Sequence, residues 1–338
     1  DAAMSRKVPV LVTGGAGYIG SHAVLALRDA GWPVAVLDNL STGFRWAVPP
    51  QVPFHHGDIA DSALVAEILK AQGIGAVMHF AGSVIVPESV ADPLKYYDNN
   101  TARTRALLSA VVEAGVPHFI FSSTAAVYGV PSDAPVTEDY ARAPANPYGA
   151  SKLMSEIMLA DVAAAHRLNY CALRYFNVAG ADPAGRAGQS GLGATSLVKI
   201  VTEVAAGKRP TLDIYGDDWP TPDGTGVRDF IHVTDLADAH VRALEALIAD
   251  PASSHVLNCG YGRGHSVREV IAAVERACGQ AVPHRVVGRR AGDIARMVAD
   301  SSAIKARFGW QPRHDDLDAI VASALAWEAR LREIRAAA

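Results

Sequence analysis

Short apolar runs alternate along this sequence with segments whose apolar residues have helical spacing. The runs are apolar nearly throughout, as is typical of strands buried on both faces. They read VPVLVTGG, PVAVLDN, AVMHFAG, HFIFSST and YCALRYFN. Between them, apolar residues recur at helical spacing, as in segments 23–27, 64–68 and 107–112. Strand and helix in strict turn predict parallel βαβ units in a doubly wound, Rossmann-type α/β sheet.

Composition limits the partners of such a chain. The formal net charge is −4 and no run of lysine and arginine occurs, so neither nucleic acid nor a membrane surface is expected as a partner. Cys171, Cys259 and Cys278 are odd in number and far apart, and the histidines are poorly spaced for a metal, so neither a disulfide framework nor a metal site is predicted. We find no signal peptide before the first strand and no apolar stretch near the roughly 20 residues that a bilayer requires. A cytoplasmic protein that binds small molecules is therefore expected.

A glycine pattern follows the first predicted strand. LVTGGAGYIGSHAV places Gly14, Gly17 and Gly20 between a strand and a helix. Glycine is needed there because the backbone turns tightly, a pyrophosphate approaches the N–H groups, and the helix packs close to its strand. Three glycines can also form a plain turn. However, the second strand ends in Asp38, whose carboxylate can accept hydrogen bonds from an adenosine ribose. It would repel the extra phosphate of NADP, so NAD is the predicted cofactor.

The segment NPYGASK, residues 146–152, places Tyr148 and Lys152 four positions apart. If a helix starts behind Asn146 and Pro147, both side chains lie on one face of its first turns. A tyrosine that acts as a base near pH 7 needs its pKa lowered from about 10, and a lysine ammonium and an oxidised nicotinamide carry the required charge. Thr124 ends the run HFIFSST at the carboxyl edge of the sheet, where it would position a substrate hydroxyl. The alternative is a half-buried aromatic ring beside an ordinary surface lysine.

Further motifs extend over nearly the whole chain. TAAVYG, YGASK and RYFNVAG resemble the extended short-chain dehydrogenase/reductases. More narrowly, GYIGSH, FAG, PLKYYDNN, NPYGASKLM, DGTGVRDFIHVTDLADAH and RRAGD resemble the UDP-glucose 4-epimerase family. The resemblance implies an enzyme that interconverts UDP-glucose and UDP-galactose. Tyr148 would remove the proton of the sugar 4-hydroxyl while the C4 hydride passes to tightly held NAD. The 4-keto sugar would then turn over and take the hydride back on its other face.

The resemblance also implies which residues contact the ligands. Besides the three glycines, those expected at NAD are Tyr18, Ile19, Asp38, Asn39, Asp58, Ile59, Phe80, Ala81, Gly82, Asn99, Lys152 and Tyr175. Besides Thr124 and Tyr148, those expected at the UDP-sugar are Phe176, Asn177 and Met297 at the sugar, with Tyr175 also shaping that end, and Arg228, Arg290 and Asp293 at the UDP. Arginine suits a diphosphate because its planar fork can donate twice and stays charged.

Three departures from the family pattern bear on binding. Val84 stands where many relatives have a lysine, so one cation near NAD is missing. Thr195 and Ser196 stand where relatives often show two asparagines that face the diphosphate. Met297 borders the expected sugar pocket, and it is slimmer and more flexible than the tyrosine of some relatives. We therefore hypothesise some tolerance for UDP-N-acetylhexosamines, and UDP-pentoses are a further alternative.

Two rival functions are weighed against epimerisation. A nucleotide-sugar 4,6-dehydratase or UDP-uronate decarboxylase could use the same scaffold. Dehydratases, however, place Asp-Glu directly after the threonine, where this chain has Ala125 and Ala126. A non-catalytic NAD-sensing protein is the second rival. Such proteins usually lose the tyrosine or the lysine, and this chain keeps both.

The expected organisation is two domains and a homodimer. Residues 4–178, with a contribution from about 228–258, would bind NAD; residues 179–227 and 259–335 would form a smaller mixed α/β substrate domain. The glycine-rich stretch after Asn177 could be a flexible linker or a loop that covers the substrate. The predicted helices in 94–112 and 152–162 carry apolar residues on more than one face, which favours a symmetric helix-pair dimer. In the second of these helices the residues are Leu153, Met154, Ile157 and Leu159.

Overall fold

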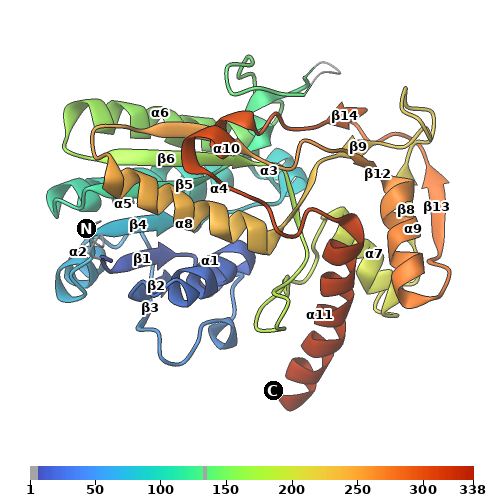
Figure 1. The fold of residues 1–338 in the computed structure, drawn as a ribbon, viewed down its shortest axis with the longest axis horizontal. Coiled ribbons are helices and arrows are strands. Elements are labelled where there is room, and N and C mark those ends of the chain that lie inside the picture. The colour runs from blue at the N-terminus through green and yellow to red at the C-terminus, as the bar shows by residue number, and fades with distance from the viewer. Residues whose placement is uncertain (1–6, 132–134) are drawn as a thin grey trace.

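A parallel sheet forms the centre of the molecule. The computed structural model describes residues 7–131 and 135–338, and within them seven strands lie in the order β11-β6-β5-β4-β1-β2-β3 (Figure 1). The strands are β1 (Val10–Thr13), β2 (Val34–Asp38), β3 (Phe54–His56), β4 (Ala76–His79), β5 (His118–Thr124), β6 (Asn169–Tyr175) and β11 (His255–Cys259). The chain winds outward from β1 in both directions, so the predicted doubly wound sheet is confirmed.

Helices cover both faces of this sheet. One core joins the sheet to α1 (Tyr18–Asp29) and α8 (Val233–Ala249), and the other joins it to α2 (Ser62–Ala71), α5 (Arg103–Glu113) and α6 (Pro147–Ala165). Within β1, Val10 and Val12 belong to the first core and Leu11 to the second, because successive strand residues point to opposite faces. All three are fully buried, which explains why the run has no polar alternation.

The structure contains strands that the apolar runs do not mark. β3 reads FHH and is half-buried or exposed, so its composition does not indicate a strand. β11 reads HVLNC and joins the edge of the sheet beside β6, far from it in sequence. The run YCALRYFN, predicted as one strand, is divided at Phe176. Its last residue, Asn177, begins β7 (Asn177–Ala179), which pairs with β10 (Phe230–His232) outside the main sheet.

Most of the remaining long helices and strands form the mixed α/β region at the right of Figure 1. The longer helices there are α7 (Leu197–Ala205), α9 (Val267–Cys278) and α11 (Leu317–Ala337). The strands form two small sheets, β8 (Leu212–Tyr215) with β13 (His284–Val287), and β9 (Val227–Arg228) with β12 (His265–Ser266) and β14 (Arg296–Met297). Short helices elsewhere are η1 (Arg45–Ala47), α3 (Val86–Ala91), α4 (Pro93–Tyr96), η2 (Tyr97–Ala102), η3 (Ala125–Tyr128) and α10 (Ser302–Phe308). The expected division at 178 stays a prediction, and its residues 4–6 and 132–134 lie outside the described part.

The glycine-rich stretch between β7 and α7 is held by side chains along its length. The Tyr18 hydroxyl donates to the Gly180 carbonyl at 2.6 Å, and the Arg186 guanidinium pairs with Asp29 at 3.0 Å. Gly188 lies against the ring of Trp327, where a Cβ would come within 2.2 Å of the ring. These contacts tie the stretch to α1 and α11. No helix in residues 7–131 and 135–338 is long and apolar enough to span a bilayer.

Candidate active site

The turn between β1 and α1 has the shape that a pyrophosphate requires. Gly14 has a φ of +69°, and a Cβ there would lie 2.7 Å from the amide nitrogen of Ala81. A Cβ at Gly20 would lie 2.1 Å from the Gly14 carbonyl oxygen, so only glycine lets α1 approach β1 this closely. α1 begins behind Gly17 without a side-chain cap, which leaves amide groups at its N-terminus for an anion. The three predicted glycines therefore form one cradle that fits a dinucleotide.

Asp38 lies beside this cradle at the end of β2. Its two carboxylate oxygens accept hydrogen bonds from the amides of Ala16 at 3.0 Å and Leu40 at 2.8 Å, and the residue is 8% exposed. Each oxygen has a second lone pair, so the fixed carboxylate can still accept ribose hydroxyls. Asn39 follows directly and accepts from the Ser41 amide at 3.0 Å.

Asp58 and Ile59 follow β3 at the same edge. One oxygen of Asp58 accepts from the Ala60 amide at 2.8 Å, and the other is ion-paired with Arg103 of α5. Arg103 also pairs with Asp98 at 3.1 Å. The sequence reasoning missed Arg103 because its partner Asp58 lies 45 positions away and no local spacing connects them.

The segment after β4 joins the cradle to the predicted catalytic residues. The Thr13 hydroxyl oxygen accepts from the amides of Phe80 and Ala81 at 3.2 and 3.3 Å. A Cβ at Gly82 would lie 3.8 Å from the Lys152 ammonium nitrogen, so this segment passes close to Lys152. Asn99 donates to the Ser83 hydroxyl at 2.9 Å.

Tyr148, Lys152 and Thr124 meet at the carboxyl end of β5. α6 begins behind Asn146, whose side chain accepts from the Gly149 amide at 2.9 Å, with Pro147 in its first turn. Tyr148 and Lys152 are 7% and 3% exposed on the same face of this helix. The Tyr148 phenol is hydrogen-bonded to the Thr124 hydroxyl. The structure thus brings together the three residues that the spacing singled out.

The electrostatics of this group differ from the expectation in one respect. Burial raises the pKa of Tyr148, and the hydrogen bond with Thr124 lowers it only in part. Burial also lowers the pKa of Lys152 to about 8. The Lys152 ammonium donates to the Ser122 carbonyl at 3.0 Å. The protein groups by themselves therefore favour a neutral phenol, and a lowered pKa requires a further positive charge nearby.

The predicted sugar end lies beyond β6. The Tyr175 hydroxyl is hydrogen-bonded to the hydroxyl of Ser122, the same residue whose carbonyl accepts from Lys152. Phe176 is 8% exposed and belongs to a small core that Met297 packs against. The Asn177 amide donates to the Asp229 carbonyl at 3.0 Å, which fixes the start of β7.

The predicted UDP end is a group of charged residues beside β9 and β14. Met297 is the register partner of Arg228, which brings the sugar and diphosphate residues together. The Arg228 guanidinium donates to the carbonyls of Val227 and Ile294 at 2.8 and 2.9 Å. Arg290 pairs with Asp293 at 3.1 Å. Burial lowers the pKa of Arg228, while the nearby Asp293 carboxylate raises it and Arg290 lowers it. Ser196 bonds Gln189 at 3.1 Å, whereas Thr195 is exposed and Val84 is 61% exposed.

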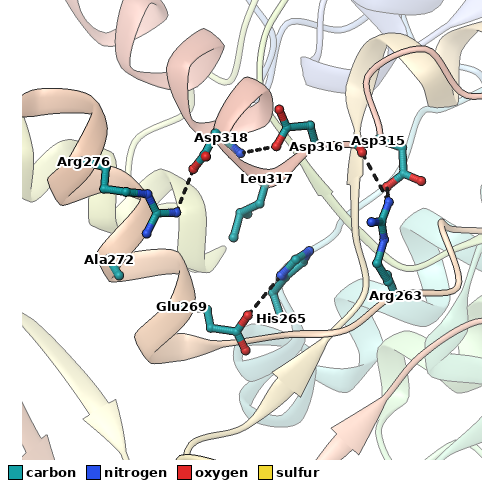
Figure 2. A pocket seen from close by; sticks show the side chains of 9 residues that line it. All are labelled: Arg263, His265, Glu269, Ala272, Arg276, Asp315, Asp316, Leu317 and Asp318. Carbon is teal, nitrogen blue, oxygen red and sulfur yellow. Dashed lines mark hydrogen bonds and ion pairs between the residues drawn. The ribbon is translucent and has the colours of Figure 1, made fainter.

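A separate depression of about 510 Å³ lies between α9 and the start of α11 (Figure 2). Its charged groups pair with one another across it, as in Arg263 with Asp315 and Arg276 with Asp318. None of the predicted site residues is among those that line it within the described chain. Paired surface charges are typical of a solvated groove, so this depression is not the candidate site.

The chain is similar to known proteins over nearly its whole length. The profile of the NAD dependent epimerase/dehydratase family matches residues 10–260. The UDP-glucose 4-epimerase of Azospirillum brasilense is 54% identical over 324 residues, which are 96% of this chain and 93% of that protein. The UDP-glucose 4-epimerase of Stenotrophomonas maltophila, solved with NAD and formylated UDP-arabinopyranose, has a TM-score of 0.93 and 42% identity and covers 98% of this chain and 100% of its own. The UDP-Glc/GlcNAc 4-epimerase of Campylobacter jejuni has a TM-score of 0.84 and 44% identity, covering 96% and 99%.

Proposed function

Because the chain belongs to the NAD-dependent epimerase/dehydratase family, we propose that Tyr148, Lys152 and Thr124 carry its chemistry. The reaction is the NAD-dependent 4-epimerisation of a UDP-hexose. The family, the cofactor and the reaction predicted from the sequence are confirmed by the relatives. The observation that carries the residue assignment is the meeting of these three side chains beside the Gly82 segment of the dinucleotide cradle.

Each of the three residues has a distinct task. Thr124 shares its hydroxyl hydrogen bond with the sugar 4-hydroxyl and holds that group against Tyr148. The phenol oxygen of Tyr148 takes the hydroxyl proton as the sugar C4 is oxidised, and it returns the proton when C4 is reduced from the other face. The Lys152 ammonium supplies positive charge near the phenol, which favours its anion.

The residues named from the sequence have chemical groups that suit the parts of NAD they would contact. The three glycines would hold the pyrophosphate, Asp38 and Asn39 the adenosine ribose, and Asp58 and Ile59 the adenine end. The amides after β4 with Asn99 would hold the nicotinamide half. Bound NAD would supply the hydride acceptor and donor for the sugar C4 and, through its oxidised ring, positive charge near Tyr148 in addition to that of Lys152.

At the other end, Arg228, Arg290 and Asp293 would bind the UDP. Desolvation of Arg228 by burial strengthens its attraction to a diphosphate, and Arg290 adds a second cation. Arg290 and Asp293 lie within the proposed substrate domain of residues 179–227 and 259–335, whereas Arg228 begins the contribution of about 228–258 to the proposed NAD-binding domain of 4–178.

The decisive variant is Tyr148→Phe. Loss of the general base should lower kcat for UDP-galactose at least 100-fold, with the fold and NAD content intact. Turnover would be followed by UDP-glucose formation, and NAD would be measured after release by denaturation. Near-normal turnover would remove Tyr148 from the mechanism. Absence of turnover with any UDP-sugar in the unmodified chain, with NAD bound, would favour the NAD-sensing rival.

Substrate choice among UDP-sugars forms a second part of the proposal. Met297 packs beside Phe176 at the sugar end without a rigid ring, which supports some turnover of UDP-N-acetylgalactosamine. The similar Campylobacter jejuni enzyme carries both glucose and N-acetylglucosamine in its name, and the Stenotrophomonas maltophila structure holds a UDP-pentose derivative. Purified protein should be offered UDP-galactose, UDP-N-acetylgalactosamine and UDP-arabinose in parallel, without added cofactor. A preference for UDP-galactose of about 1000-fold or more, near 4 kcal/mol, would end the proposed tolerance.

A homodimer and a cytoplasmic location complete the proposal. Met154 and Ile157 on α6 are 42% and 54% exposed and lie on one face three residues apart, where a partner helix could cover them. All three cysteines of the chain are free thiols, which suits a reducing compartment.

A further inference from the structure

α6 carries a third buried residue in line with Tyr148 and Lys152. Glu156 follows Lys152 by four positions and is 5% exposed, so the three side chains form one stripe on the inner face of the helix. A carboxylate at such a place is costly unless it is paired and hydrogen-bonded. The proposed chemistry gives this residue no task of its own.

Each member of the stripe is joined to a different residue of β5. Tyr148 bonds the Thr124 hydroxyl, and Lys152 donates to the Ser122 carbonyl at 3.0 Å. Glu156 accepts from the Ser123 hydroxyl at 2.5 Å. Three consecutive strand residues are thus matched to three successive turns of one helix. A slip of one helix residue, about 1.5 Å and 100°, would break all three contacts at once.

Arg174 of β6 locks the third contact. Its guanidinium, 1% exposed, donates through Nη2 at 2.6 Å and through Nε at 3.0 and 3.2 Å to the two oxygens of Glu156. Arg174 is the register partner of Ser123, so both groups reach Glu156 from neighbouring strands. A planar fork on a carboxylate fixes direction as well as distance.

The same guanidinium reaches toward the substrate side. Its Nη1 donates at 3.0 Å to the Tyr128 hydroxyl, which donates at 2.5 Å to the Asn258 amide oxygen. The Asn258 side-chain nitrogen donates to the carbonyls of Val136 at 2.7 Å and Asp300 at 3.3 Å. These bonds connect the stripe to the chain just beyond Met297.

We propose that Glu156 is a positioning residue, held by Arg174 and Ser123, that sets the register of α6 on β5 and thereby places Lys152 and Tyr148 against Thr124. The inference rests on the proposed roles of those three residues. Without the lock, the folded enzyme keeps its ligands but the phenol, the ammonium and the sugar hydroxyl no longer align, and misplacement of about 1 Å is enough to slow a reaction about 100-fold.

The test is Glu156→Gln, which keeps the size of the side chain and removes its charge. We expect kcat to fall ten- to 100-fold, with KM for UDP-galactose within threefold and NAD content unchanged. The ascending limb of the kcat–pH profile should move to higher pH, because a displaced Lys152 stabilises the phenolate less. All assays would be made well below the unfolding temperature of each variant.

Glu328→Gln is the matched control. Glu328 is equally buried and is ion-paired with Lys199 and Lys208 between α7 and α11, away from α6. Its loss should lower thermal stability as much as the loss of Glu156, with kcat and the pH profile retained. If Glu156→Gln behaves like this control, Glu156 is only structural and the inference is overturned.

Two further variants make the result decisive. Ser123→Ala removes one hydrogen bond and leaves the ion pair, so it should fold and lower kcat three- to tenfold. If Glu156→Gln does not fold, an unchanged kcat and pH profile in Ser123→Ala overturns the inference. Tyr148→Phe in the same assay separates the two proposals: an active Tyr148→Phe means that the site assignment itself is wrong.

Discussion

Burial of Lys152 opposes the ammonium charge on which its proposed role depends. Its partners are the neutral Ser122 carbonyl at 3.0 Å and the Phe121 ring, whose centroid lies 5.0 Å from the ammonium. Burial lowers its pKa to about 8, so in the chain alone the ammonium is largely present below that pH and lost above it. A lysine poised in this way responds to small changes in neighbouring charge.

Lys152→Met should therefore change both rate and pH dependence. We expect kcat to fall at least tenfold and the ascending limb of the kcat–pH profile to move to higher pH, because the Tyr148 pKa rises when the ammonium is removed. Initial rates from about pH 6 to about pH 10 would show the shift. A profile that stays in place would mean that Lys152 does not tune the phenol.

The pH dependence of stability gives a second check on Lys152, from the parent compared with the same variant. Below pH 8 the lysine is charged in both folded and unfolded chains, and its burial costs about 3 kcal/mol, the gap between a pKa of about 8 and the ordinary 10.5. That cost is relieved as the pH rises from about 8 to 10.5. The free energy of unfolding of the parent, relative to that of Lys152→Met, should therefore rise across this window in urea titrations.

At this scale the sequence supplied the residue types and their spacing, but not their surroundings. Tyr148, Lys152 and Thr124 could be named because a four-residue spacing and a strand end are local features. The raised pKa of the Tyr148 phenol could not be predicted from the sequence, because desolvation depends on how the rest of the chain covers the phenol. Arg103 was missed for a similar reason, since its partner Asp58 is remote in sequence.

Among the elements, those with strong local signals were predicted and those defined by their neighbours were not. α6 was predicted from Asn146, which caps the helix, and from Pro147 in its first turn. β3 was missed because a half-buried edge strand of three residues needs no apolar run. The end of β6 was placed too late, because the chain leaves the main sheet at Phe176 to pair with β10, and the run stays apolar across that break.

The register of α6 on β5 belongs to the same class of long-range features. Glu156 lies at helical spacing from Lys152, which sequence alone could have noted. Its partners Ser123 and Arg174 lie 33 and 18 positions away, and only the pairing of β5 with β6 brings them together. A buried ion pair of this kind favours one alignment of the helix on the strand over alignments shifted by a residue. This selectivity is a different contribution from the free energy of unfolding.

At the scale of the molecule, the candidate site lies where the sheet meets the smaller mixed region. Most of the proposed NAD residues follow the carboxyl ends of β1, β2, β3 and β4, whereas Arg228 and Met297, proposed at the UDP-sugar, come from β9 and β14. A bridge between Val136 and Ala299 links the segment after β5 to the chain beyond Met297. Arg228 and Met297 are therefore held by a different sheet from Thr124 and the proposed cofactor residues, and this bridge joins the two parts.

The predicted dimer can be tested on the exposed face of α6. The unmodified chain should have about twice the monomer mass of 35.5 kDa in sedimentation or light scattering. The double variant Met154→Asp, Ile157→Asp should run as a monomer, because two carboxylates cannot be buried together in an apolar interface. Val286→Asp is the matched control, since Val286 is 43% exposed on β13, outside the helix pair, and should leave the mass unchanged. A monomeric parent at micromolar concentration, or a dimeric double variant, would rule out this face as the interface.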